Sequence, residues 1–181
     1  MAPVTSTGLE NVAEAKAVIE RSGLDVLVVN ALTFDDLDQI AWSGEPRHRV
    51  AVSEALSRVA SGDVEYLAVR VPSGGPVAKV GIDFARYRGS GYLWQFATHP
   101  ELQGLGIGSF LLAAAEARII TRGLRLARIN VEDENPRARQ LYERLGYAIM
   151  GRDTETWERV DVAGGITLHR AEVTLMGKQL S

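Results

Sequence analysis

Hydrophobic and polar positions first recur with a helical period. Over Leu9–Arg21 apolar residues return every three or four positions among acidic and basic ones, which predicts an amphipathic helix that ends at Gly23. The next predicted elements are a strand over Leu24–Leu32, a short helix capped by Thr33 or Asp35 and running to Trp42, and a helix over Arg47–Ser61. The first sixty residues therefore predict mainly helices.

From residue 64 onward the pattern becomes that of short strands separated by glycine turns. The predicted strands cover Val64–Val71, Val77–Arg86 and Tyr92–Thr98. The stretch from Pro72 to Pro76 and the Gly89–Gly91 turn separate them. Such closely spaced strands favour an antiparallel meander.

The following elements alternate between helix and strand. A helix is predicted over Gly106–Arg122, a strand over Leu124–Glu132, a helix over Pro136–Leu145, and strands over Tyr147–Val160 and Gly165–Met176. A strand that returns after a helix calls for a right-handed crossover and a parallel strand pair. We therefore expect one α/β domain over residues 1–181, with a mixed, mostly antiparallel sheet of about seven strands flanked by helices and a helical extension over residues 1–23.

Composition narrows the class of protein. The chain is 46% hydrophobic and 24% charged, which is typical of a globular fold. Its net charge of −3 lacks the basic excess that general binding to nucleic acid or anionic membranes favours. The first residues carry no basic stretch followed by an apolar core, and no uninterrupted apolar run is long enough to span a membrane. We expect a cytoplasmic protein without a nucleic-acid or membrane partner.

Cysteine and histidine usage removes several chemistries. Without cysteine there can be no disulfide, thiolate zinc site or cysteine nucleophile. The three histidines, His48, His99 and His169, are not spaced to place two imidazoles on one helix face. We therefore expect no metal site, and any acyl transfer to proceed without a cysteine intermediate.

A glycine-rich run, Gln103–Ser109, lies between a predicted strand and the longest predicted helix. Backbone N–H groups at such a helix N-terminus bind anions, and glycine lets a phosphate approach closely. A nucleoside triphosphate loop is excluded because no lysine follows Gly108. A dinucleotide-binding fingerprint is disfavoured. If it began at Gly106 it would require a small residue at Leu111, and if it began at Gly104 it would place Ser109 there, which is only marginally acceptable. The preceding strands also form a meander.

A second motif begins at Asn135 and forms the next helix. Asn135 is suited to the N-cap, Pro136 to the first turn, and Gly146 to the C-terminal end. Four apolar or aromatic residues share one face of this helix: Ala138, Leu141, Tyr142 and Leu145. Tyr142 should therefore point inward, where its hydroxyl needs a partner, either a core carbonyl or a functional group.

Together the two motifs resemble the GNAT superfamily of N-acetyltransferases. Gln103-x-x-Gly106-x-Gly108 has the form of that family's pyrophosphate loop, and the resemblance extends over Val64–Met176. It implies acetyl-CoA as co-substrate and Tyr142 as the general acid that protonates the leaving thiolate. It also implies cofactor contacts from a set of residues on the strand, loop and helix: Phe96, Ala97, Thr98, Gln103, Gly104, Leu105, Gly106, Ile107, Gly108, Ser109, Asn135, Ala138 and Tyr142.

The general base and the acceptor stay open at this stage. The strand Tyr92–Thr98 contains no carboxylate, so Glu132 and Asp83 are the candidate bases, with a chain of water molecules as the alternative. Tryptophans at 42, 94 and 157 could line an acceptor pocket or simply pack in the core. The sequence predicts transfer of an acetyl group to a primary amine of a small molecule or protein. The alternative is a non-catalytic acyl-CoA-binding or regulatory domain, and the choice between monomer and homodimer is left open.

Overall fold

A sheet of seven strands runs through the residues that the computed structural model describes, which are 7–44, 46–72, 74–160 and 165–181. Its order is β1-β2-β3-β4-β5-β7-β6, and only the pair β4 and β5 is parallel. The strands are β1 (Val28–Ala31), β2 (Val64–Arg70), β3 (Pro76–Asp83), β4 (Gly91–Thr98), β5 (Leu126–Glu132), β6 (Ala148–Val160) and β7 (Ile166–Gln179). This mixed, mostly antiparallel sheet confirms the predicted fold class.

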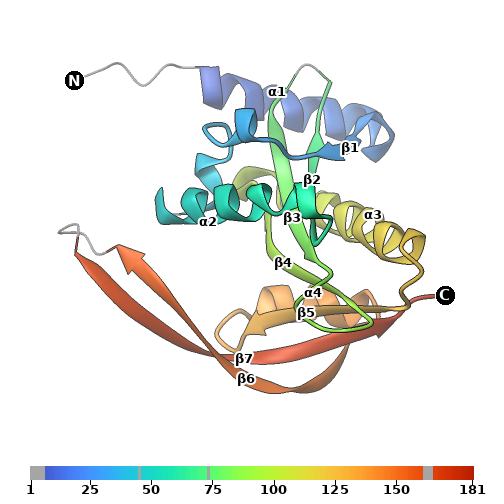
Figure 1. Ribbon diagram of the computed structural model, residues 1–181. Helices are drawn as coiled ribbons and strands as arrows, with labels where there is room; N and C mark the ends of the chain where they lie inside the picture. Colours follow the sequence, from blue (N-terminus) through green and yellow to red (C-terminus); the bar gives the residue numbers. More distant parts are fainter. Residues whose placement is uncertain (1–6, 45, 73, 161–164) are drawn as a thin grey trace.

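Helices cover both faces of the sheet. They are α1 (Thr7–Ser22), α2 (Pro46–Ser57), α3 (Ile107–Thr121) and α4 (Pro136–Arg144), with short 3-10 turns η1 (Leu24–Val26), η2 (Phe34–Asp36), η3 (Ala41–Ser43), η4 (Val59–Ser61) and η5 (Pro100–Leu102). In Figure 1, α2 crosses the first strands, and the hairpin of β6 and β7 extends away from them on the left. Among the described residues, no helix has the length and apolar character needed to cross a membrane.

Two hydrophobic cores lie on opposite faces of the sheet. The larger core joins α1, α3 and α4 to one face, and the smaller core lies beneath α2. Alternation along β2 assigns Leu67 and Val69 to the larger core and Tyr66 and Ala68 to the smaller. On β3, Val80 packs in the larger core. Its neighbour Lys79 therefore points to the opposite face, toward α2.

The parallel pair β4 and β5 separates partway along its length. The two strands pair only from Gly91 with Ala127 to Leu93 with Ile129. On the other side of β4, the register with β3 shifts between Lys79 and Gly81. Gln95 lies opposite this shift with a φ of 50°, which non-glycine residues seldom adopt. The bulge and the separation open the sheet beyond Leu93.

Several predicted boundaries were wrong. The strand expected over Leu24–Leu32 is limited to Val28–Ala31, because the chain leaves Gly23 in a 3-10 turn. The helix expected to run to Trp42 is two separate 3-10 turns, although Thr33 does form a capping box with Asp36. The helix expected to reach Ser61 stops at Ser57 and is followed by η4. The strand expected to reach Arg86 ends at Asp83, whose side chain turns the chain.

Candidate functional site

The glycine-rich loop joins the end of β4 to the start of α3. Gly104 and Gly106 have φ values of 90° and 85°, and Gly106 is the N-cap of α3. Positive φ is inexpensive only for glycine, so the loop's shape depends on these positions. The first N–H groups of the helix have no partner within it and point out of its N-terminus. No acidic residue stands in the first turn of α3 to compete for an anion.

Gly108 brings the helix close to β4. A Cβ atom at this position would lie 3.0 Å from the Phe96 ring and 3.4 Å from the Thr98 hydroxyl. The side-chain amide of Gln103 donates a hydrogen bond to the Thr98 carbonyl at 3.3 Å and ties the loop back to the strand. The loop therefore lies against the free end of β4, which the separation from β5 exposes.

A cleft of about 600 Å³, here called the loop cleft, opens beside these elements. It is lined by twelve of the thirteen residues that the resemblance assigns to the cofactor: Phe96, Ala97, Thr98, Gln103, Gly104, Gly106, Ile107, Gly108, Ser109, Asn135, Ala138 and Tyr142. Leu105 is the exception, because its side chain packs against the larger core. Sequence reasoning missed Arg137 and Arg144, two exposed cations of α4 that also line this cleft. Their charge suits a phosphorylated ligand.

Asn135 is the N-cap of α4, and Tyr142 lies within this helix, which packs against the larger core. The Asn135 side chain accepts a hydrogen bond from the N–H of Ala138 at 3.0 Å and caps the helix, as its sequence position predicts. Both Asn135 and Ala138 also line the loop cleft. The cap therefore fixes the end of α4 beside the glycine loop.

Tyr142 is 4% exposed, and its ring lies 6.2 Å from that of Phe96. Burial raises the pKa of its hydroxyl well above the ordinary value of 10.0. None of the described residues accepts a hydrogen bond from this hydroxyl. The ring thus packs in the larger core, while the hydroxyl is protonated at neutral pH and has no hydrogen-bond partner among the described residues.

A wider cleft of about 1020 Å³, here called the acidic cleft, lies on the other side of Tyr142. Its charged residues are five carboxylates, Glu54, Glu132, Asp153, Glu155 and Glu158, and two guanidinium groups, Arg47 and Arg86. Both guanidinium groups are paired, Arg47 with Glu158 and Arg86 with Glu155. The remaining carboxylates leave the cleft negatively charged.

The two clefts meet at one place. Phe96, Asn135, Ala138 and Tyr142 line both of them, together with Ser43 of η3. A ligand lying along the loop cleft and another in the acidic cleft would therefore meet beside the Tyr142 hydroxyl. The arrangement suits a transfer of a group between two bound molecules.

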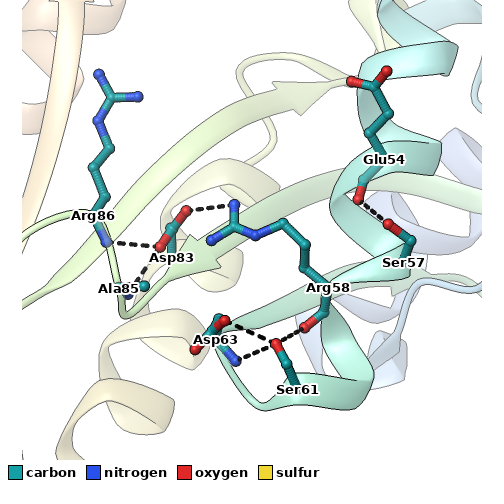
Figure 2. A network of polar contacts seen from close by, with 8 residues as sticks. All are labelled: Glu54, Ser57, Arg58, Ser61, Asp63, Asp83, Ala85 and Arg86. Atoms are coloured by element: carbon teal, nitrogen blue, oxygen red, sulfur yellow. Dashed lines mark hydrogen bonds and ion pairs between the residues drawn. The ribbon is translucent and has the colours of Figure 1, made fainter.

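The two candidate bases lie in different environments. Glu132 is exposed at the end of β5 and lines the acidic cleft. Asp83 lines neither cleft and instead accepts hydrogen bonds from Arg58 at 2.8 Å and from the N–H groups of Ala85 and Arg86 at 2.9 Å, as Figure 2 shows. Burial alone would raise the Asp83 pKa, but these hydrogen bonds outweigh it and lower the pKa below its usual value. Asp83 thus turns the chain at the end of β3.

The tryptophans are divided between the clefts. Trp94 and Trp157 line the acidic cleft, and Trp42 lines the loop cleft. Trp42 and Trp94 also pack against the smaller core. The core-packing interpretation therefore holds for Trp42 and Trp94, and the acceptor-pocket interpretation stays a prediction for Trp94 and Trp157. Among the described residues, no group of three or more histidine, cysteine, aspartate or glutamate side chains is placed to hold a metal ion.

Comparison with known proteins assigns the chain to a family. A model of the Acetyltransferase (GNAT) family matches residues 34–147, more than half of the chain. The chain belongs to the GNAT acetyltransferase family. It is accordingly an acetyl-CoA-dependent acyltransferase, as the sequence resemblance implied.

Solved structures share the fold of this GNAT protein at low sequence identity. A Vibrio cholerae spermidine N-acetyltransferase in complex with CoA and spermine is 21% identical, with a TM-score of 0.65 and coverage of 85% of this chain and 95% of that one. An IAA acetyltransferase from Bacillus cereus is 14% identical, with a TM-score of 0.66 and coverage of 85% and 99%. Both likenesses concern the fold.

Proposed function

We propose that this GNAT protein transfers an acetyl group from acetyl-CoA, bound in the loop cleft, directly to a primary amine of a cationic acceptor in the acidic cleft. The observation that carries the proposal is the meeting of the two clefts at Tyr142. With no cysteine in the chain, a thiol intermediate is excluded, and the two substrates would react side by side.

Binding of acetyl-CoA would rest on backbone groups. The N–H groups that begin α3 suit the pyrophosphate, and the cations Arg137 and Arg144 add charge at the rim. The exposed edge of β4 from Phe96 to Thr98 offers backbone groups to the pantetheine arm. One of these N–H groups could then donate to the thioester oxygen as negative charge develops there.

Tyr142 would act as the general acid. The acceptor nitrogen forms a bond to the thioester carbon, the carbon–sulfur bond breaks, and the phenol donates its proton to the departing thiolate. The acylated nitrogen then gives its surplus N–H proton to the phenolate, which restores Tyr142. Burial keeps Tyr142 protonated over the pH range in which amines react. The free position of its hydroxyl between the clefts suits this role.

The charge of the acidic cleft favours an acceptor that carries further positive charge. The cleft is lined by five carboxylates and by two guanidinium groups that are already paired. The Asn130 side-chain oxygen is also buried there without a hydrogen-bond donor among the described residues. An ammonium-bearing chain supplies both charge and donors. The similar fold of a spermidine N-acetyltransferase agrees with this class of acceptor. The same chemistry would also admit a lysine side chain of a protein.

Two measurements test the proposal. Acetyl-CoA should raise the melting temperature, because a ligand of the folded state stabilises it by RT ln(1 + [L]/Kd). Release of free CoA should then be followed with spermidine, with cadaverine, and with delta-aminovalerate, in which a carboxylate replaces one aminomethyl group of cadaverine. We expect cadaverine to react at least about tenfold faster than delta-aminovalerate in kcat/KM, a difference of ~1.4 kcal/mol.

The outcomes separate the alternatives. No thermal shift with acetyl-CoA would contradict the assignment of the loop cleft. A shift without turnover of any amine would favour a non-catalytic acyl-CoA-binding domain. Equal rates for cadaverine and delta-aminovalerate would remove the cationic acceptor while leaving acetyl transfer intact.

A further inference from the structure

Lys79 is a cation-forming side chain in the middle of an apolar strand, and its residue is 0% exposed. Its Nζ lies 2.9 Å from the Gln95 carbonyl oxygen, 2.8 Å from Nε2 of His48 and 3.3 Å from the Tyr66 hydroxyl. A charged lysine this deeply buried is costly unless it is fully hydrogen-bonded. Nothing in the binding of acetyl-CoA or in the role of Tyr142 accounts for its presence.

The partners of Lys79 are suited to either protonation state. As an ammonium, Lys79 has three N–H donors for three acceptors, namely the Gln95 carbonyl, the Tyr66 oxygen and an unprotonated Nε2 of His48. As a neutral amine, it keeps two donors for the carbonyl and the hydroxyl, and its lone pair accepts a hydrogen bond from a protonated Nε2 of His48. Tyr66 donates its own proton to the Gln95 side chain at 3.0 Å in both states. No polar group of the network loses its partner when a proton is added.

His48 connects this network to the acidic cleft. It lies on α2 and lines the cleft, whereas Lys79 lies behind it. Gly44 packs against the imidazole so closely that a Cβ atom there would lie 2.9 Å from the Cβ and Cγ atoms of His48. With Nε2 directed at Lys79 and one side of the ring against Gly44, Nδ1 is the nitrogen left for a ligand of the cleft.

Burial weakens the affinity of both groups for protons. It lowers the pKa of Lys79 to about 7. For His48, burial together with the nearby charge of Lys79 lowers the pKa to about 4. Near neutral pH the pair therefore gains or loses a proton at Lys79. The imidazole of His48 remains neutral, and only the ring nitrogen that carries its proton changes.

Building on the proposed acetyl transfer, we propose that His48 and Lys79 together accept the proton that the acceptor ammonium must lose before it attacks. The N–H bond of the ammonium breaks as Nδ1 of His48 takes the proton, and Nε2 passes its own proton to the lone pair of Lys79. The imidazole ends neutral, the free amine is released for attack, and the positive charge rests on Lys79. This would supply the general base that neither Asp83 nor the strand β4 provides.

The charge arrives where it can assist the reaction. Lys79 donates to the carbonyl of Gln95, and that carbonyl belongs to the same peptide group as the N–H of Phe96. A stronger hydrogen bond at the carbonyl makes the N–H of the same peptide a better donor. Phe96 lines both clefts, so its backbone is at the place where the thioester would lie. Loss of the amine proton and stabilisation of the thioester oxygen are thereby coupled.

Other titratable groups around the pair set its pH response. Tyr66 on β2 stays a neutral phenol, because burial raises its pKa well above 10.0. On α2, His48 is accompanied by Arg47, which pairs with Glu158 of β6, and by Glu54. No carboxylate contacts Lys79 or His48 within the described residues. The pair thus titrates without a neighbouring acid.

The kinetic test compares His48→Gln and Lys79→Met with a control histidine variant, His169→Gln, which lies on β7 outside both clefts. With acetyl-CoA and spermidine, or the first amine of the panel that is turned over, both site variants should lose about 100-fold in kcat/KM near pH 7. The loss should shrink toward pH ~10, where the alkylammonium deprotonates in solution. The control should match the wild type. A loss of the same size at every pH would overturn the proposal, because it would indicate damage to the structure instead of to a base.

A second measurement does not depend on turnover. Heteronuclear NMR of the His48 ring should show the Nδ1–H tautomer below pH 7 and the Nε2–H tautomer above it, with the change centred at about 7 where Lys79 titrates. Lys79→Met should abolish the change. A fixed tautomer, or an imidazolium forming near the ordinary histidine pKa of 6.5, would overturn the proton pair even in an active enzyme. A normal tautomer change without acetylation of any amine would instead overturn the proposed function, and with it the catalytic role of the pair.

Discussion

The loop cleft and the acidic cleft share the tyrosine at their junction but are built differently. The loop cleft is formed mainly by two segments of sequence, the end of β4 with its glycine loop and one face of α4. The acidic cleft is formed mainly by side chains from α2, β4, β5 and β6, with Tyr142 of α4 at its junction with the loop cleft. Sites formed by a local stretch of backbone leave a pattern in the sequence, whereas sites assembled from distant side chains become visible only in the fold. The candidate site for acetyl-CoA could therefore be predicted from the sequence, whereas the proposed acceptor site could not.

The largest effect is expected at the junction of the clefts. Tyr142→Phe should slow turnover by about 100-fold or more, because removal of a general acid typically costs 10²–10⁴-fold, while the KM for acetyl-CoA stays close to that of the wild type. Initial rates with saturating acetyl-CoA and amine provide the measurement.

Tyr147→Phe is the matched control. Tyr147 is also buried, but its hydroxyl donates to Glu116 at 3.0 Å and lies outside both clefts. This variant should lose about 1 kcal/mol of stability and keep its kcat. Equal kcat values for Tyr142→Phe and the wild type would assign Tyr142 to packing alone.

A smaller effect is expected for a change confined to the loop cleft. Gly106→Ala should raise the KM for acetyl-CoA about tenfold, because a side chain at φ 85° strains the loop and displaces the N–H groups that begin α3. The acceptor KM should be unaffected. Titration of acetyl-CoA at fixed amine, and of amine at fixed acetyl-CoA, gives both values.

Gly123→Ala separates strain from binding. Gly123 has a similar φ of 76° and open space where an added Cβ would lie, but it lies outside both clefts. Both alanine variants should lose stability by about 1–2 kcal/mol. If the two also weaken acetyl-CoA binding to the same extent, the loop would have no special part in binding.

A change confined to the acidic cleft should be weaker still. Glu132→Gln is expected to raise the KM for a cationic amine about threefold with little change in kcat, because one exposed carboxylate contributes ~0.2–1 kcal/mol. The difference should diminish with added salt. Glu143→Gln, on α4 and outside both clefts, serves as the control. If Glu132→Gln instead slowed turnover about 100-fold, Glu132 would be the base in place of His48 and Lys79.

No effect on catalysis is expected at Asp83. Asp83→Asn should lower the free energy of unfolding by about 1–3 kcal/mol, because Arg58 and the turn N–H groups lose a charged acceptor. The Asp83 pKa is lower in the folded than in the unfolded protein, so its contribution is present above the ordinary value of 3.8 and is lost as the pH falls through the folded pKa. Denaturant unfolding at pH 7 and pH 3 measures this difference. A loss of kcat with unchanged stability would return Asp83 to the catalytic candidates.

The sequence predicted the strands, the crossover and the glycine loop because each depends on local spacing. It failed at Leu24–Leu32, where an apolar run is shared between a 3-10 turn and a short strand. It also gave no reason to connect His48 with Lys79, which come from α2 and β3 and meet only after the sheet is covered. The one available signal was the lysine itself, a charge flanked on both sides by apolar residues within β3. The pairing of His48 with Lys79 depends on tertiary contacts, which the pattern of a single sequence does not contain.

The central claim is that the acetyl group passes directly between two occupied clefts at Tyr142. Initial rates measured while acetyl-CoA and a turned-over amine are both varied test it most directly. We expect double-reciprocal plots whose lines intersect, as required when both substrates must be bound before reaction. Parallel lines, with an acetylated protein isolated in the absence of amine, would contradict the account.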